Sequence, residues 1–416
     1  MRTTALATVG FLGVAALAVS GCSAAGTPED DGGDVTISYT NFISNGGNEE
    51  NLQAIVDAFE DENPGITVDV TTLPYADYGT ALQTDLAAGT ASDVFDVEYS
   101  NYASYQANGV LAPLEVSDTG VYRQSVLEAY ATDGTQYALP SSFSTVVMFY
   151  NKDMFEAAGL ETPADGWTWD DVESAAETLT DEAAGVWGAH QPVSFYEFYK
   201  VLEQSGGSFL DESGTKVAFN TPEGVEAAEW LVGKSGTVMP TIEQGQGTPD
   251  FDTNLFTEGK LAMLYTGIWM FGAFADVPFG WDIAVEPGNT QQASALFSNA
   301  VGVSAQSENG EAATKFAEFL TSSDVMVDTR LEAGWELPAI SDDAKLESYL
   351  TLGNPDNRQA VFDSLENVAL PPVVAEGQQE MQDIMTEELI EAQSGRKSVE
   401  EALASAEERI NAAIGG

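Results

Sequence analysis

The sequence predicts an α/β fold, with mostly parallel strands and helices on the faces of the sheet. Short apolar strand patterns alternate with helical patterns from residue 35 onward, which is the order typical of this class. The chain has 416 residues, which at about 150 residues per domain indicates two or three domains. Its 44% hydrophobic and 10% aromatic residues suffice for packed cores, so wholesale disorder is excluded.

The N-terminal part shows this alternation most clearly. Alternating or continuous apolar residues predict strands at 35–39, 66–70 and 93–98. Apolar residues at helical spacing predict a helix over 49–62, which ends before an Asn-Pro-Gly turn, and a second helix over 78–88, which ends at Gly89.

The pattern restarts after Tyr137. Strands are predicted at 145–150, 261–265 and 281–285, and helices at 153–158, 168–179, 221–232, 312–320, 381–389 and 399–410. Several helix starts carry their own signals. Asp153 is expected to cap the first of these helices, Thr168 with Asp171 and Ser398 with Glu401 form capping boxes, and Pro222 occupies a first helical position. Trp169, Trp187, Trp230 and Trp281 are expected in the core.

Charge excludes one class of partner. The chain has 67 acidic and 14 basic residues, a net charge of −53. Such a surface repels phosphate backbones and anionic lipid, so we expect no nucleic-acid binding. Most of this charge must cover the solvent face, and it disfavours anionic ligands.

Cysteine and histidine counts exclude much chemistry. The chain has one cysteine, Cys22, and one histidine, His190, so an intrachain disulfide and the common zinc sites are excluded. No Gly-x-Ser-x-Gly motif accompanies His190, which we expect at a strand end or in a loop. No cofactor is implied. The sequence contains no Asp-x-Asp-x-Asp-Gly loop, so no metal site is predicted. Calcium binding by scattered carboxylates stays an open alternative.

The N-terminus has the pattern of an export signal. Residues 1–21 combine a basic start with a fifteen-residue apolar run, too short for a permanent span. The run ends in Val-Ser-Gly before Cys22, which resembles a bacterial lipobox. Diacylated Cys22 would anchor the chain stably to the membrane surface. Residues 22–34 then read as a lipidated cysteine and flexible tether, so the mature protein is expected outside the cytoplasmic membrane as a lipoprotein.

Several segments in order resemble one protein family. These are YALP at 137–140, FYNKDMFEAAGL at 149–160, GGSF at 206–209, FNTPE at 219–223, FTEGKLAM at 256–263, GIW at 267–269 and GWELPA at 334–339. Together they resemble the extracellular solute-binding proteins of carbohydrate ABC importers, the family that includes the maltose-binding protein.

The resemblance implies a two-lobed periplasmic-binding-protein-like fold with a hinge and an interlobe ligand cleft. Lobe one would comprise 35–140 plus 296–323, and lobe two 141–295 plus 324–416. It also implies a monomer without catalytic activity that binds a carbohydrate ligand by lobe closure and delivers it to membrane permease subunits. With so few basic residues, a neutral oligosaccharide fits best.

Candidate ligand-binding residues follow strand ends or lie in aromatic segments. Ligands in open α/β sheets lie beyond the carboxyl ends of strands, and aromatic faces suit the C–H face of a sugar while carboxylates and amides take its hydroxyls. The candidates are Asn41, Phe42, Tyr99, Ser100, Ser142, Tyr196, Asp252, Trp269, Trp335 and Glu336.

Three other functions stay open on the residues alone. A cationic or other non-sugar solute would suit an aromatic cage. A secreted glycoside hydrolase needs paired carboxylates, and 67 acidic residues make any pairing uninformative. A structural protein of the cell envelope is the third.

Overall fold

The computed structural model describes residues 34–43, 47–164, 166–374 and 376–415. The predicted signal peptide, Cys22 and nearly all of the tether lie outside these residues. The helices are α1 Glu49–Glu62, α2 Tyr75–Ala88, α3 Tyr99–Ala107, α4 Gln124–Glu128, α5 Lys152–Ala158, α6 Trp169–Leu179, α7 Phe195–Gln204, α8 Pro222–Val232, α9 Ile242–Gly245, α10 Phe251–Thr257, α11 Gly310–Ser322, α12 Asp324–Ala333, α13 Asp343–Glu347, α14 Gln359–Asp363, α15 Gln378–Gln393 and α16 Val399–Ile414. The strands are β1 Val35–Asn41, β2 Ile66–Thr72, β3 Val94–Glu98, β4 Ala131–Thr132, β5 Thr135–Gln136, β6 Ala138–Asn151, β7 Trp187–His190, β8 Leu261–Gly267, β9 Trp281–Ala284, β10 Ser294–Val303 and β11 Val368–Ala369.

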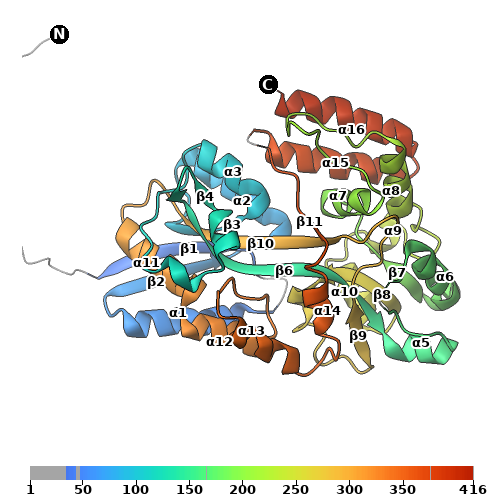
Figure 1. The fold of residues 1–416 in the computed structure, drawn as a ribbon, viewed down its shortest axis with the longest axis horizontal. Helices are drawn as coiled ribbons and strands as arrows, with labels where there is room; N and C mark the ends of the chain where they lie inside the picture. Colours follow the sequence, from blue (N-terminus) through green and yellow to red (C-terminus); the bar gives the residue numbers. More distant parts are fainter. Residues whose placement is uncertain (1–33, 44–46, 165, 375, 416) are drawn as a thin grey trace, which may run out of the picture.

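Two long strands join the two halves of the molecule. The main sheet has the order β2-β1-β3-β10-β6-β8-β7, with β9 paired to β6 and β11 to β10. Strands β6 and β10 run antiparallel across the middle of the molecule (Figure 1). On one side β10 pairs with β3, and on the other β6 pairs with β8 and β9. The predicted α/β class is confirmed. The expectation of mostly parallel strands is wrong for the middle of the sheet, where β6 and β10 pair antiparallel with each other and with their neighbours β3, β8 and β9.

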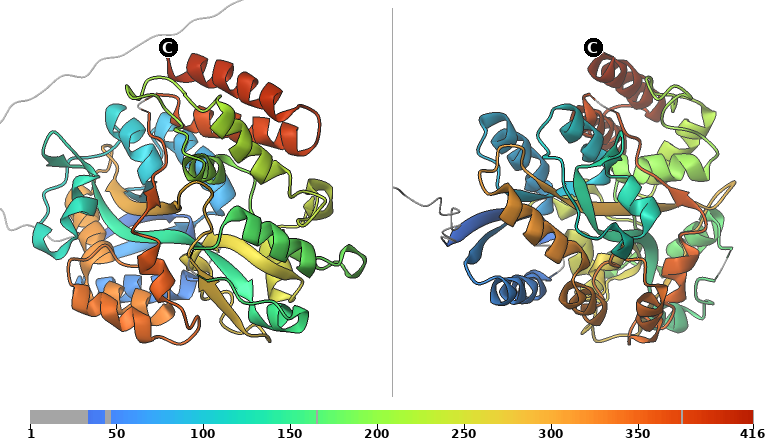
Figure 2. Two further views of the ribbon diagram at one scale, coloured as in Figure 1. Left: turned by 45° about the vertical axis from the view of Figure 1, so that its right-hand side comes forward. Right: turned by 60° about the vertical axis from the view of Figure 1, so that its left-hand side comes forward.

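Helices cover both halves of the sheet. Helices α1 and α11 pack together beside β1, whereas α6 packs on β7 and α7 packs on α8 in the other half (Figures 1 and 2). Helix α12, which the predicted division assigns to lobe two, packs against α1 and α11. The limits of the two lobes stay a prediction.

Most predicted helix starts are found where the sequence places them. Capping boxes at Thr168 and Ser398 open α6 and α16. Asp153 was the wrong cap for α5, because the Asn151 side chain accepts the Met154 N–H and Asp153 lies one residue inside the helix. Strand β6 runs directly into this helix, so its last residue occupies the capping position.

The predicted core tryptophans pack as expected. Trp169 and Trp230 stack at a centroid distance of 4.6 Å and join α6 to α8. Trp187 and Trp281 are buried in the strands β7 and β9. The aromatic run that includes Tyr196 was not predicted as a helix, yet it forms most of α7.

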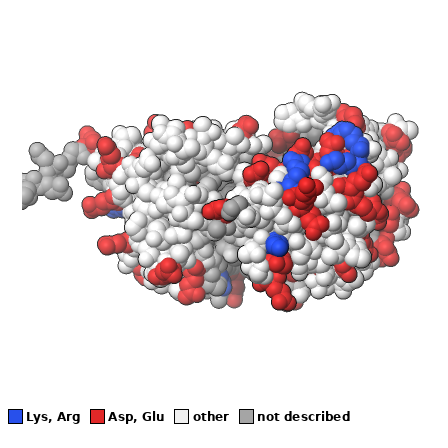
Figure 3. All heavy atoms as spheres, turned by 90° about the horizontal axis from the view of Figure 1, so that it is seen from above, with Lys and Arg blue, Asp and Glu red and all other residues white. Residues whose placement is uncertain are grey.

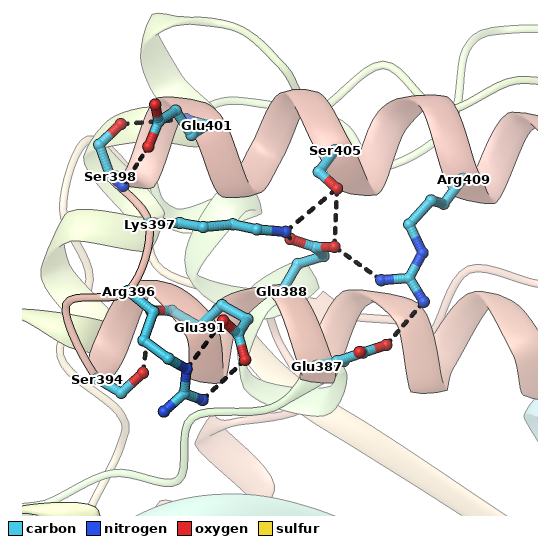
Figure 4. A network of polar contacts seen from close by, with 10 residues as sticks. All are labelled: Glu387, Glu388, Glu391, Ser394, Arg396, Lys397, Ser398, Glu401, Ser405 and Arg409. Carbon is cyan, nitrogen blue, oxygen red and sulfur yellow. Dashed lines mark hydrogen bonds and ion pairs between the residues drawn. The ribbon is translucent and has the colours of Figure 1, made fainter.

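The last two helices are held together by one buried carboxylate. Glu388 of α15 is 2% exposed and accepts hydrogen bonds from Lys397, from Ser405 at 2.8 Å and from Arg409 at 2.7 Å (Figure 4). Burial by itself raises the pKa of Glu388, but these three bonds outweigh burial and leave that pKa below its ordinary value. The carboxylate therefore stabilises the hairpin only while it is ionised.

We expect Glu388→Gln to lower the free energy of unfolding by about 2–3 kcal/mol at pH 7, because several charge-assisted bonds are lost at a buried position. The Glu388 contribution is complete above its unfolded pKa of 4.5 and is lost as the pH falls from there through the lower folded value. Urea unfolding at pH 7 and pH 3 measures both effects. Glu387→Gln is the matched control, because Glu387 is 60% exposed and bonds only Arg409 among the described residues, so its loss is expected to stay below about 1 kcal/mol. Equal losses for the two variants would contradict this interpretation.

Candidate ligand-binding cleft

A cleft of about 290 Å³ lies where the two halves meet. It lies beside the crossing strands and takes residues from both halves. Its walls include Phe42, Tyr75, Glu98, Tyr196, Glu197, Tyr265, Trp269, Phe297, Asn299, Trp335 and Glu336. The described lining residues are aromatic, aliphatic or neutral polar except for three carboxylates, and none of them is a lysine or arginine.

Aromatic rings form pairs on the cleft walls. Phe42 and Tyr75 meet edge to face at 5.6 Å in one half. The ring of Phe297, on the crossing strand β10, lies 5.7 Å from Tyr196 and 5.9 Å from Trp269. Such an arrangement offers flat apolar faces at several angles around one cavity.

Trp269 reaches the cleft because of a glycine. Strand β8 ends at Gly267, and the chain turns through the short helix η4 Ile268–Met270. A Cβ atom on Gly267 would lie 1.9 Å from the Trp269 ring, so only glycine lets the indole fold back over the strand end. The GIW segment therefore places an indole at the carboxyl end of β8.

Glu98 is the last residue of β3 and has two neutral hydrogen-bond partners. Its carboxylate accepts from the Tyr75 hydroxyl at 2.8 Å and from the Asn101 amide at 3.3 Å. Burial raises the pKa of Glu98 to about 6, although the bond from Tyr75 opposes this. The carboxylate is therefore ionised at neutral pH and can accept a hydroxyl hydrogen from a ligand.

Glu336 ties the crossing strands to the segment after α12. Its carboxylate accepts from Ser142 of β6 at 2.8 Å, from Asn299 of β10 at 3.2 Å and from Arg330 of α12 at 3.2 Å. The same guanidinium lies 3.9 Å from the ring centroid of Trp335. Arg330 therefore compensates one cleft carboxylate and stacks on one cleft indole.

The structure brings half of the predicted ligand residues to the cleft. Phe42, Tyr196, Trp269, Trp335 and Glu336 line it, and Ser142 lies one hydrogen bond behind Glu336. Contact between these residues and a ligand stays a prediction.

The other four predicted residues do not line this cavity. Asn41 is fully buried, and its side-chain amide oxygen accepts the Ile43 N–H at 3.2 Å to close a turn. The Tyr99 ring packs on Tyr130 at 6.0 Å, and Ser100 is buried in α3. Asp252 of α10 faces His190 with a distance of 3.8 Å between the carboxylate and Nδ1.

Sequence reasoning missed several wall residues. Glu98, Tyr75 and Asn299 lie at a strand end, at a helix start and inside a crossing strand, respectively. Glu98 immediately precedes the predicted candidates Tyr99 and Ser100. The expectation therefore identified the correct strand end but missed the last residue of the strand itself. Tyr265 and Phe297 lie within apolar runs that gave no separate signal.

His190 ends β7, as predicted. Burial lowers its pKa, while Asp252 and Glu197 act in the opposite direction. Within the described residues, no group of three or more His, Cys, Asp or Glu side chains is arranged to hold a metal ion. In the same part of the chain, no helix has both the length and the apolar character needed to cross a bilayer.

Comparison with solved structures gives two informative neighbours. An ABC substrate-binding protein of Listeria monocytogenes, solved with cycloalternan, is 41% identical, with a TM-score of 0.87 over 92% of this chain and 99% of that one. An ABC transporter solute-binding protein of Thermotoga lettingae, bound to α-D-tagatose, is 26% identical, with a TM-score of 0.82 over 92% of this chain and 100% of that one.

Sequence comparison leads to the same family. An arabinooligosaccharide-binding protein of Bacillus subtilis is 25% identical over 325 residues, which cover 74% of each chain. The family model described as bacterial extracellular solute-binding protein matches residues 45–327. The predicted resemblance is thereby confirmed, and the chain belongs to the bacterial extracellular solute-binding proteins.

Proposed function

We propose that this protein captures a neutral oligosaccharide in the cleft between its halves and delivers it to the permease subunits of an ABC importer. The observation that carries this proposal is the composition of the cleft, which combines aromatic rings with carboxylate and amide acceptors. Rings of this kind cover the apolar faces of sugars, and the acceptors bind hydroxyl hydrogens. The proposal includes no catalytic step.

The relatives support the carbohydrate class. The Listeria protein was solved with cycloalternan, and the Bacillus relative is named for arabinooligosaccharides. Since the first of these is 41% identical over nearly the whole chain, cycloalternan is the first saccharide to test. The three cleft carboxylates and the overall charge of −53 disfavour uronates and phosphorylated sugars.

Closure of the two halves provides the transport signal in this proposal. A ligand that touches both walls binds the closed arrangement more tightly than an open one, and this difference in affinity drives closure. The permease then recognises the closed form. Diacylated Cys22 and the residues up to 34 would keep the protein at the outer face of the cytoplasmic membrane, beside its permease, as a monomer.

Isothermal calorimetry against a saccharide panel tests the proposal. The panel contains cycloalternan, linear gluco-, galacto- and arabino-oligosaccharides, one uronate oligomer and one polyamine. We expect one site per chain for at least one neutral saccharide and no binding of the uronate. Binding of the polyamine alone, or of nothing in the panel by a folded sample, would overturn the proposal.

Saccharide affinity is expected to fall as the pH is lowered through about 6. The pKa of Glu98 is raised to about 6 by burial, so its acceptor carboxylate becomes protonated in that range. Glu98→Gln should bind about tenfold more weakly at pH 7 and should lose this acid-side step. Glu226→Gln on the exposed side of α8 is the control and should keep the parental profile. An unchanged acid-side step in Glu98→Gln would remove Glu98 from the site.

A further inference from the structure

Three charged side chains are buried together behind the cleft. Lys200 of α7 and Glu286, which follows β9, are both fully buried, and Glu197 of α7 is 6% exposed. The Lys200 ammonium donates to Glu197 at 2.6 Å and also to Glu286. One cation is therefore shared by two carboxylates in the interior.

This cluster reaches the cleft through two wall residues. Glu197 lines the cleft, and its paired oxygen also accepts from the Gln191 amide at 2.8 Å. Tyr265 lines the cleft as well, with its ring 5.7 Å from the Lys200 ammonium. Its hydroxyl is buried and has no hydrogen-bond partner among the described residues. Lys200 thus lies directly behind Glu197, an acceptor on the cleft wall, and beside Tyr265, another residue of that wall.

The charges of the cluster do not cancel. With both carboxylates ionised the cluster is negative by one charge, which is costly in a buried site. Burial raises the pKa of Glu286 to about 7, although Lys200 lowers it. The cluster therefore exchanges a proton with solvent near neutral pH.

The groups around Glu286 do not remove this imbalance. Tyr199 and Glu203 belong to the same helix as Lys200, and Tyr265 faces the cluster from β8. Burial holds the pKa of Lys234 well below its ordinary value, and burial also lowers the pKa of His190. We therefore expect neither residue to add a second positive charge to the cluster. From β10 the Ala295 N–H donates to Glu286 at 3.4 Å.

We propose that Lys200 is a positioning residue of the cleft and that the protonation of Glu286 decides how it acts. When Glu286 is neutral, Lys200 pairs with Glu197 alone and holds that carboxylate in place as an acceptor for a ligand hydroxyl. When Glu286 is ionised, the cluster keeps a net negative charge, and a ligand in the cleft displaces the water that screens it on the Glu197 side. Ligand binding therefore draws a fraction of a proton from solvent onto the Glu286 carboxylate near neutral pH. This inference rests on the proposed saccharide function.

The sign of the pH effect follows from this linkage. Because the bound state holds Glu286 protonated more strongly than the free state, affinity falls as the pH rises through about 7. We expect a loss of about three- to tenfold between pH 6.5 and pH 8.5, since a shift of one pKa unit corresponds to a factor of ten. Glu98 acts on the opposite, acidic side, so the two effects separate by pH.

Calorimetry with cycloalternan in phosphate and in Tris tests the inference between pH 6.5 and 8.5. The different ionisation enthalpies of the buffers report protons taken up, and we expect a fraction of a proton that peaks between pH 7 and 8. Glu286→Gln should abolish the uptake and keep at pH 8.5 the affinity it has at pH 6.5. Glu98→Gln should retain the uptake.

The outcomes distinguish the inference from the function on which it rests. Binding with heats that do not depend on the buffer, or an unchanged pH profile in Glu286→Gln, would overturn the inference and leave the saccharide function standing. No cycloalternan binding at any pH, together with no binding across the saccharide panel, would overturn both. If Glu286→Gln does not fold, the proton count of the wild-type protein decides alone.

Discussion

Trp269→Ala is expected to weaken saccharide binding by about ten- to one-hundredfold. The indole lies at the carboxyl end of β8, folded over Gly267 and 5.9 Å from Phe297 on the crossing strand β10. Removing it deletes an apolar face on which a sugar ring would stack, a change typically worth about 1.5–3 kcal/mol at the centre of a binding site. Calorimetric titration of parent and variant with the same saccharide measures the loss.

A second tryptophan controls for general effects of such a truncation. Trp167 is partly exposed, packs on Phe155 at 6.2 Å and lies outside the cleft lining. Trp167→Ala should bind saccharide with the parental affinity. Equal affinities of Trp269→Ala and the parent would place the ligand elsewhere.

Arg330→Met is expected to reduce both stability and affinity. Arg330 is 6% exposed, pairs with the Glu336 carboxylate at 3.2 Å and stacks on Trp335. Methionine keeps much of the apolar volume but leaves Glu336 without its cation, and breaking a buried pair costs about 3–5 kcal/mol. Trp335 also loses the planar group that fixes its ring. Denaturant unfolding and saccharide titration measure the two losses.

Two further variants separate charge from shape. Arg330→Met combined with Glu336→Gln should recover part of the stability, because the uncompensated carboxylate is removed. Arg396→Met is the matched control, since Arg396 forms a two-bond ion pair with Glu391 at the surface and is 56% exposed. Its loss should stay below about 1 kcal/mol. A stability loss for Arg330→Met no larger than this control would show that the buried pair contributes little.

Local patterns in the sequence were sufficient for many elements of the fold. Helix α1 was predicted with the observed limits, because Leu52, Ile55, Val56 and Phe59 form one apolar face and all are buried. Strand β6 was predicted only from residue 145, yet it begins at Ala138. Ser141, Ser142 and Ser144 are buried on this strand, so its polar first half carried no hydrophobic alternation to detect.

The candidate site was less predictable, because its side chains meet through long-range contacts. The expectation that ligand residues follow strand ends was correct for Phe42 and Trp269, which line the cleft. Asn41 does not line it, because its side chain accepts the N–H of Ile43. Glu336 was a candidate, but its partners on β6, β10 and α12 are set by the crossing of two distant strands. The charge cluster at Lys200 joins α7 to a residue 86 positions later, which no local period encodes.

A crystal structure of the protein with a bound saccharide from the panel tests the central claim most directly. The account predicts a sugar held between both halves, with ring faces against Trp269 or Trp335 and hydroxyls on Glu98 or Glu197. A saccharide bound outside this cleft, or in contact with one half alone while the cleft stays empty, would contradict it.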